Sequence, residues 1–528
     1  MPDPREFSQP KRSTSMGLGD RGKGPSSGAL SNSESPYAAR MPLKPPPGEG
    51  SAANTNSYGS GGKRSMKEMN TPEIIRPSPG NPSRQSEPQT AMFNLLATIV
   101  GGGVLSLPYA FRLTGVLTGI VLMALAAVGG DFSLYMLCSC ARRTGQITYV
   151  EVAQAAFGDS GAFVTTSILM VMTIFVMIAY MVLVRDLWTS IVASIVGQAL
   201  DATQSTHVLF VALAVVFPAC LAKDLHALRH FCYVGFFSAM VLTAAIAYRS
   251  VQANENDPSA KMELKLSADS WGDIFQAFPI ICLSFLCHFN ILSVHQQFVN
   301  PTRERLKGLL HGTMGLTAAL YITLGLCGYL YAYEGTKASK CHLTPPPPPC
   351  FQDDIFLNFE PGDQVMILGR VGMGLNMLVA ITMLVLPCRD IVFTVMDSIT
   401  ETIKGCCGWK DDYLPVDGNG DVLATPGGTP IARIGTFFMM IRHVGTTFAI
   451  MGFSLFCALS VPGVGVVWSI CGSSVGFMIC YVLPSLFYLK IRWHKSFNIR
   501  KAGAFVMLAS SLVAMTICTR HAVVQALQ

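Results

Sequence analysis

The chain has 528 residues, of which 50% are hydrophobic and 13% are charged, and its formal net charge is +6. A soluble protein of this length carries roughly twice that fraction of charged residues. The composition therefore excludes an ordinary soluble protein and predicts an all-α polytopic membrane protein embedded in a lipid bilayer. The basic residues lie mostly beside the apolar segments, so the net charge implies no nucleic-acid partner.

Residues 1–90 are rich in Ser, Pro, Gly and Asn and contain almost no long apolar runs. Such a segment cannot bury enough apolar surface to offset the conformational entropy of the chain. We therefore predict a disordered, cytosolic N-terminal tail over 1–90 and a transmembrane domain over 91–528.

Eleven apolar segments follow the tail, and their lengths suit helices that cross a bilayer. They lie near 91–113, 115–140, 161–186, 206–222, 227–248, 272–298, 308–333, 364–388, 442–460, 463–489 and 502–520. Basic residues are enriched in alternate connecting loops, such as those that contain Arg142, Arg143, Arg303, Arg305 and Lys307. Because cytosolic loops carry an excess of Lys and Arg, the N-terminus is predicted to be cytosolic. After an odd number of spans the C-terminus is then extracellular or luminal.

The first apolar segment contains residues that interrupt a helix in its middle. Gly101, Gly102 and Gly103 are consecutive, and each costs about 1 kcal/mol of helix propensity relative to alanine. Pro108 follows, and proline has no amide proton. A break inside the membrane exposes amides and carbonyls that need a polar partner, which in secondary transporters is the substrate. The alternative is close packing of two helices through small residues, but three consecutive glycines exceed what such packing needs.

The sixth apolar segment is also irregular. After Pro279 it carries Ser284, His288, Asn290 and His295 among apolar neighbours. Five spans separate the starts of the two irregular segments, and an odd number of spans inverts the second copy of a repeat. The pattern predicts a 5+5 inverted repeat with broken helices 1 and 6, and an eleventh helix outside the repeat.

The motifs in these two segments resemble those of the amino acid/auxin permease family, within the amino acid–polyamine–organocation superfamily. Residues 101–111 read Gly-Gly-Gly-Val-Leu-Ser-Leu-Pro-Tyr-Ala-Phe and are similar to the first-helix motif of that family. Residues 285–290 read Phe-Leu-Cys-His-Phe-Asn and are similar to its sixth-helix motif. The resemblance covers roughly residue 91 to the end of the eleventh segment. It implies a LeuT-like fold and amino acid transport by alternating access.

We expect the backbone at both breaks to bind the amino acid. The amides that would donate to its carboxylate, aided by the half-helix dipole, belong to Gly101, Gly102, Gly103 and Val104. The carbonyls that would accept from its ammonium group lie around Cys287, His288 and Asn290. Neutral substrates are favoured, because no obvious charge at the two breaks would complement a charged side chain. The sequence has no catalytic motif, metal-ligand spacing or cofactor fingerprint in the context that each requires, so we do not expect an enzyme.

The coupling ion is predicted to be a proton or sodium. Sodium-using members of the family typically have Asn four residues before the first glycine, where this chain has Ala97. This difference favours a proton, although Thr98 and Asn94 offer oxygen ligands for sodium. His288 is a candidate proton carrier because imidazole titrates near physiological pH, and the alternative is a neutral histidine that holds the helix break. Asp131 is a further candidate, because a carboxylate within a span is costly and often functional.

Cys341 and Cys350 flank a proline run in a predicted outer loop, where a disulfide is expected in an oxidising compartment. The strongest alternative function is an amino acid receptor that has the same fold and signals through the N-terminal tail. Both the plasma membrane and an acidic organelle membrane suit the sequence. The sequence does not predict the oligomeric state.

Overall fold

A computed structural model gives the fold and describes residues 86–221, 231–256, 265–299, 301–335, 352–360, 362–407 and 430–527. These residues form helices, and one isolated β-bridge joins Ser86 to Phe298. The predicted tail lies almost wholly outside the described residues, and so do Cys341 and Cys350. The disordered tail and the disulfide therefore stay predictions.

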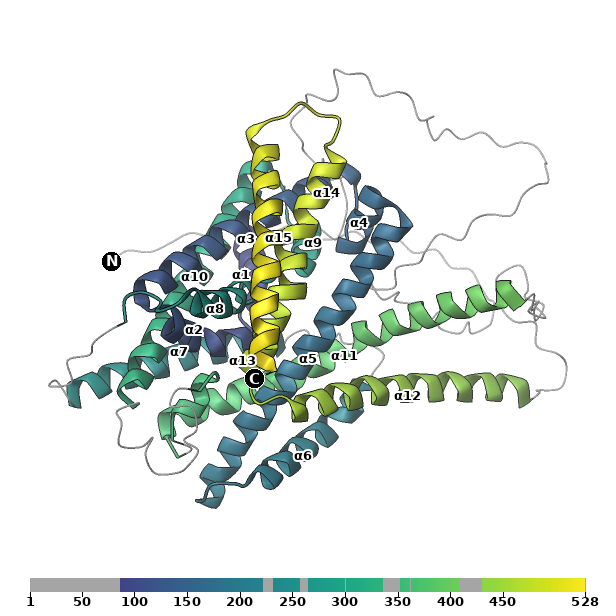
Figure 1. The fold of residues 1–528 in the computed structure, drawn as a ribbon. Coiled ribbons are helices and arrows are strands. Elements are labelled where there is room, and N and C mark those ends of the chain that lie inside the picture. Colours follow the sequence, from purple (N-terminus) through teal and green to yellow (C-terminus); the bar gives the residue numbers. More distant parts are fainter. Residues whose placement is uncertain are drawn as a thin grey trace, which may run out of the picture. The chain divides into compact units, whose positions relative to one another are not determined.

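The helices follow the predicted apolar segments in chain order (Figure 1). Three segments contain more than one helix. The first has α1 (Pro88–Ile99), the 3₁₀ helix η2 (Gly102–Ser106) and α2 (Leu107–Thr114), and the sixth has α8 (Trp271–Ser284) and α9 (His288–Gln297). The tenth has α13 (Val464–Cys471), the π-helices η5 (Gly472–Gly476) and η6 (Met478–Val482), and α14 (Leu483–Ile491). The other segments contain α3 (Val116–Thr144), α5 (Asp159–Val196), α6 (Ala202–Cys220), α7 (Phe231–Asn256), α10 (Arg303–Gly335), α11 (Gln364–Cys407), α12 (Pro430–Ser460) and α15 (Ile499–Ala526). The short helices α4 (Tyr149–Phe157) and η4 (Ile355–Asn358) lie in connections.

Nine helices of the described residues are long and apolar enough to cross a membrane. The pair Pro88–Ile99 and Gly102–Thr114 adds a tenth span if it is counted as one helix bent by 57°. The chain is therefore an all-α integral membrane protein, as predicted. The count of eleven spans and the inverted repeat stay predictions.

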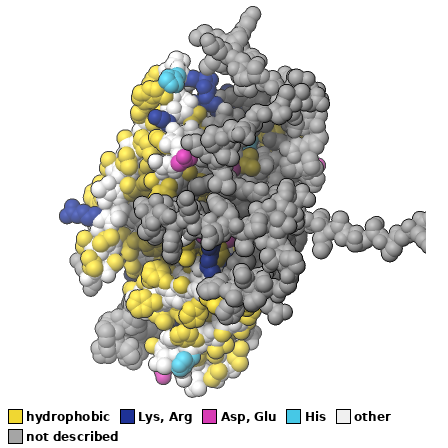
Figure 2. All heavy atoms as spheres, turned by 90° about the vertical axis from the view of Figure 1, so that its right-hand side faces the viewer, with side chains coloured by type: hydrophobic (Ala, Val, Ile, Leu, Met, Phe, Trp, Pro, Cys, Tyr) yellow, Lys and Arg dark blue, Asp and Glu magenta, His cyan; other side chains and the backbone are white. Residues whose placement is uncertain are grey.

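Burial separates central from peripheral spans. In the most apolar 18 residues of each span, 78% are buried in Trp271–Gln297 and 72% in Val464–Ile491, but only 22% in α6 and 17% in α15. Exposed side chains on these two outer helices include Val215 and Val506. Figure 2 shows hydrophobic side chains over much of the described surface on one face. Such a surface suits contact with lipid.

Two helices continue past the charges at which their spans were predicted to end. α5 extends beyond Asp186 to Val196, and Gly197 ends it with a left-handed φ of 77°. α11 likewise extends past Asp390 to Cys407. Hydropathy shows where an apolar segment of the sequence ends, whereas a helix ends where a capping or helix-breaking residue stops its backbone hydrogen bonds. The helices therefore continue beyond the ends of the predicted apolar segments at 186 and 388.

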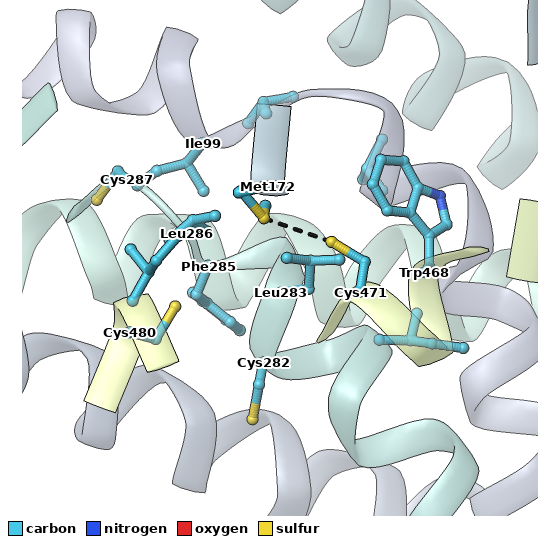
Figure 3. Close-up of a cluster of buried hydrophobic side chains, with 14 of the residues drawn as sticks. Ile99, Met172, Cys282, Leu283, Phe285, Leu286, Cys287, Trp468, Cys471 and Cys480 are labelled. Atoms are coloured by element: carbon cyan, nitrogen blue, oxygen red, sulfur yellow. Dashed lines mark hydrogen bonds between the residues drawn. The ribbon is translucent and has the colours of Figure 1, made fainter. Parts of the chain in front are cut away.

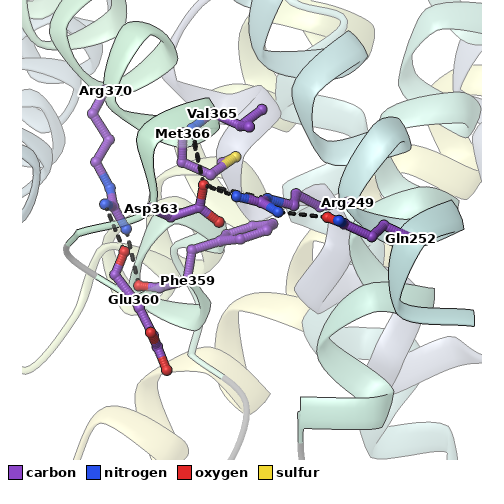
Figure 4. A network of polar contacts seen from close by, with 8 residues as sticks. All are labelled: Arg249, Gln252, Phe359, Glu360, Asp363, Val365, Met366 and Arg370. Atoms are coloured by element: carbon purple, nitrogen blue, oxygen red, sulfur yellow. Dashed lines mark hydrogen bonds and ion pairs between the residues drawn. The ribbon is translucent and has the colours of Figure 1, made fainter. Parts of the chain in front are cut away.

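Charged side chains hold the described part of the connection between α10 and α11 (Figure 4). Arg249 of α7 pairs with Asp363, with 2.6 Å between Nη2 and Oδ1. Arg370 of α11 is fully buried. Its guanidinium donates to three carbonyls of the connection at 2.9–3.0 Å, those of Phe356, Phe359 and Glu360. This described part of the connection is therefore held against α7 and α11.

Candidate functional site

The first predicted break lies between α1 and η2. Val100 has a ψ of 88°, and Gly101 is extended with φ −128° and ψ −155°. The amide of Val104 donates to the carbonyl of Gly101 at 3.3 Å, so one of the four predicted donors is used within the break. No backbone acceptor among the described residues contacts the amides of Gly101, Gly102 and Gly103. A buried helix break thus presents three amides that need a partner.

The three glycines lie against side chains of other spans. A Cβ at Gly102 would lie 2.6 Å from Cε1 of Tyr180 in α5, and a Cβ at Gly101 would lie 3.0 Å from the hydroxyl of the same tyrosine. A Cβ at Gly103 would lie 3.3 Å from Oγ of Ser284. The glycines therefore both break the helix and allow close packing. Tyr180 was not predicted, and its only sequence signal is a hydroxyl in the middle of a long apolar segment.

The second predicted break lies between Ser284, the last residue of α8, and His288, the first residue of α9. The carbonyl of Cys287 accepts from the amides of Asn290 at 3.0 Å and Ile291 at 3.1 Å, so it already opens α9. No backbone amide in the described part of the chain donates to the carbonyls of the two preceding residues, 285 and 286. The carbonyls without a backbone donor therefore lie just before the three residues that the sequence indicated.

A buried cluster brings the two breaks together. Figure 3 shows residues of α1, α5, α13, η6 and the sixth-span break in this cluster, among them Ile99, Met172, Phe285, Leu286, Cys287, Trp468, Cys471 and Cys480. Tyr321 of α10 is fully buried at the same place. Its hydroxyl lies 2.9 Å from the carbonyl of Ile99 and 3.0 Å from that of Ser284. One side chain therefore caps the helix ends at both breaks.

The predicted oxygen ligands for sodium lie beside this junction. Oγ1 of Thr98 donates to the carbonyl of Asn94 at 2.9 Å and accepts from Nδ2 of Asn290 at 2.7 Å. Oδ1 of Asn94 accepts from the hydroxyl of Tyr233 at 3.3 Å. Both side-chain oxygens are therefore hydrogen-bonded within the bundle. Within the described ranges, no group of three or more His, Cys, Asp or Glu residues is arranged to hold a metal ion.

The contacts of His288 identify its tautomer. Nε2 lies 3.1 Å from Oγ of Ser133 in α3, and the Ser133 hydroxyl donates to the carbonyl of Cys480 in η6. A serine hydroxyl has one proton, so Oγ must accept from Nε2–H. Nδ1 is buried and has no hydrogen-bond partner among the described residues. This arrangement favours the neutral histidine that holds the break and leaves Nδ1 as an acceptor.

Asp131, the remaining predicted coupling residue, lies in α3 and contacts a residue that the sequence did not indicate. Its Oδ1 is 2.9 Å from Nδ1 of His311 in α10. Among the described residues, the Asp131–His311 pair does not contact the two breaks. The same helix, α3, also carries Ser133, which contacts His288 at the second break. His311 could not be predicted, because the contact joins helices that are 180 residues apart in sequence.

The comparisons with known proteins identify the family of the chain. A family model described as transmembrane amino acid transporter protein matches residues 84–524. Human solute carrier family 38 member 10 is 23% identical over 408 residues, which are 76% of this chain and 32% of the human protein. The Xenopus laevis protein named "Putative sodium-coupled neutral amino acid transporter 10" is 23% identical over 435 residues, 81% of this chain and 37% of that protein. The chain thus spans about a third of the length of these curated relatives.

A solved structure of MhsT in complex with L-phenylalanine is similar at a TM-score of 0.49 and 12% identity, covering 82% of this chain and 98% of that chain. The decisive comparison is the family model, because it covers most of the sequence and both helical breaks. Its members are transporters and not enzymes. The chain belongs to the family of transmembrane amino acid transporter proteins.

Proposed function

We propose that this chain carries neutral amino acids across a membrane by alternating access, coupled to a cation gradient. Beyond family membership, one observation carries the proposal. The amides of Gly101, Gly102 and Gly103 have no backbone acceptor in the described part of the chain, and they lie in a buried break beside a second break. An amino acid has a carboxylate for the amides and an ammonium group for the carbonyls at residues 285 and 286.

We further propose that the spans form a LeuT-like 5+5 inverted repeat. The repeat is supported by the position of the breaks, which fall in the first and the sixth predicted spans. In such repeats the substrate lies near the middle of the membrane, between half-helices. Tyr321 would then hold the two half-helices at a fixed separation, because its hydroxyl contacts a carbonyl from each.

The side chains against the glycines support a neutral substrate. Tyr180, Leu183 and Ser284 lie closest to the positions where the glycines would carry a Cβ, and none of them is charged. A charged substrate side chain buried there would need a partner of opposite charge. The name of the Xenopus laevis relative also refers to neutral amino acids.

The coupling ion in this proposal is a proton. Ala97 stands where sodium-using members of the family that the motifs resemble typically have asparagine, and the side-chain oxygens of Thr98 and Asn94 already have hydrogen bonds. The name of the Xenopus laevis relative refers to sodium, so the test must include both ions.

The test is uptake of radiolabelled L-alanine, L-glutamine, L-leucine and L-phenylalanine by the purified chain in proteoliposomes, with a proton or a sodium gradient imposed separately. We expect saturable accumulation driven by the proton gradient. Accumulation driven only by sodium would contradict the choice of ion. Binding of an amino acid without any flux would contradict transport and favour the receptor.

A further inference from the structure

An acidic and a basic side chain meet between two membrane spans, away from the proposed substrate site. Asp131 lies in the middle of α3 with its side chain 17% exposed, and His311 of α10 is 63% exposed. Oδ1 of the aspartate and Nδ1 of the histidine are 2.9 Å apart. Ionisable groups within membrane spans are costly and usually functional.

We propose that Asp131 and His311 together form the binding site for the coupling proton. This inference rests on the proposed proton-coupled transport. With one proton between them, the pair is either an ion pair or two neutral groups, and its net charge is zero in both forms. Release of that proton to water leaves neutral His311 and the carboxylate of Asp131, with a net charge of −1 among membrane helices.

The other titratable side chains on the helices around the pair have different neighbours. On α10, Arg303 contacts Tyr135 and Lys307 contacts Glu304, and on α7, Arg249 contacts Asp363. At the end of α14, Arg492 contacts Ser139 and Lys490 contacts Phe157, and at the start of α15, Arg500 contacts Tyr135. On α8, α4 and α9, Asp273 contacts Lys265, Glu151 contacts Thr148, and His288 contacts Ser133. Arg305 of α10 contacts the carbonyl of Val299. Arg112 of α2, Arg142 and Arg143 of α3, and the buried His295 of α9 also lie on these helices. In the described part of the chain, His311 is the charged partner that contacts Asp131.

α3 connects the pair to the proposed substrate site. Ser133 follows Asp131 by two residues, which is about 200° around the helix, so the two side chains lie on nearly opposite faces. One face pairs with His311 of α10, and the other bonds His288 at the break in the sixth span. α3 and α10 are in contact here, because a Cβ at Gly130 would lie 3.8 Å from Sδ of Met314, an ordinary van der Waals distance. A change in the charge of the pair therefore acts on the helix that positions His288.

A coupling site must also exchange its proton with water. His311 lies one helical turn after Lys307, which ion-pairs with Glu304 in the first turns of α10. One turn is about 5.4 Å along the helix axis, so the imidazole is close to the charged end of this span. Asp131 is thus buried enough to make its charge costly, and His311 is near enough to the interface to exchange a proton with water.

The test compares gradient-driven accumulation with substrate exchange in proteoliposomes, using the same radiolabelled mixture of four neutral amino acids. A gradient of about one pH unit sustains about tenfold accumulation if one proton moves with each substrate. In Asp131→Asn we expect the accumulation ratio to fall to about one, whereas exchange without a gradient stays within about threefold of wild type. His311→Gln should shift the pH at which accumulation is half-maximal, and Asp131→Glu should restore accumulation.

Glu304→Gln is the matched control, because it removes an exposed acid from an ion pair at the end of α10 and should leave accumulation unchanged. Wild-type-like accumulation in Asp131→Asn would overturn the inference. Equal losses of exchange and accumulation in a monodisperse variant would also overturn it, since they indicate a structural pair. If Asp131→Asn does not fold, His311→Gln decides: an unshifted pH of half-maximal accumulation in a variant that still exchanges substrate would overturn the inference. Absence of any flux in the wild type would instead contradict the proposed function.

Discussion

At the scale of single residues, the sequence indicated His288 as a candidate but left its protonation open. The tautomer depends on Ser133 and on the carbonyl of Cys480, which come from the second and tenth spans. Sequence spacing carries no information on such contacts, because each helix is placed by packing over its whole length. These contacts support the alternative in which a neutral imidazole holds the helix break, and that role of His288 stays a prediction.

Ser133→Ala tests that positioning role. The substitution leaves Nε2 of His288 and the carbonyl of Cys480 buried without their partner, which costs about 1–3 kcal/mol of stability. We predict a lower Tm in detergent and weaker amino acid binding. Ser485→Ala is the control, because its buried hydroxyl has no hydrogen-bond partner among the described residues and its loss should change stability by less than about 0.5 kcal/mol. Equal Tm values for the two variants would contradict the role.

Asp354 provides a pH-dependent test in the connection between α10 and α11. It is fully buried, and its Oδ1 accepts from the amide of Phe356 at 3.0 Å. Burial, followed by the charge of Asp186, raises the pKa of Asp354 well above its usual range. A raised folded-state pKa gives stability that is complete below the unfolded value of about 3.9 and is lost as pH rises through the folded-state pKa.

We therefore predict that part of the fall in Tm between about pH 4 and neutral pH comes from Asp354. In Asp354→Asn this slope should be shallower, because an amide does not ionise and can still accept from Phe356. The comparison is a series of thermal unfolding curves in detergent across pH, with Asp269→Asn as the control because that carboxylate is 80% exposed. Identical slopes in wild type and Asp354→Asn would show that the buried carboxyl is not responsible.

At the scale of helices, local composition was sufficient to predict where the first and sixth spans break. Glycine triplets and prolines act on the backbone of their own segment, so a sequence can indicate their effect. The carbonyls without a backbone donor lie at 285 and 286, just before the predicted residues. The exact helix start could not be predicted because the packing of α8 and α9 decides it. Tyr180 and Tyr321 were missed for a similar reason, since their role depends on contacts between distant segments.

Tyr321→Phe tests whether the two breaks are held together. Without the hydroxyl, the buried carbonyls of Ile99 and Ser284 lose their shared donor, which should lower stability by about 1–3 kcal/mol. The expected result is a lower Tm and a lower affinity for the amino acid. Tyr331→Phe keeps a ring that stacks on Phe359 at 4.1 Å and should be nearly neutral. A neutral Tyr321→Phe variant would mean that packing alone holds the breaks.

At the scale of the whole molecule, composition was enough to predict an all-α membrane protein, and the motifs were enough to predict the family. Long apolar runs determine the spans because lipid requires helices with satisfied backbones. The orientation rests on the distribution of basic residues in loops that lie partly outside the described ranges, so it stays a prediction. The ends of α5 and α11 show that helices extend beyond their apolar parts.

The most direct test of the account is amino acid uptake by Gly102→Leu in proteoliposomes under a proton gradient. A side chain at this position would start 2.6 Å from the ring of Tyr180 and would fill the space beside the free amides. Gly315→Ala is the control, because a Cβ there meets nothing within 4 Å. We predict that Gly102→Leu loses uptake and binding while it remains monodisperse, and that Gly315→Ala transports like wild type. Wild-type uptake by folded Gly102→Leu would contradict a substrate site at the broken first helix.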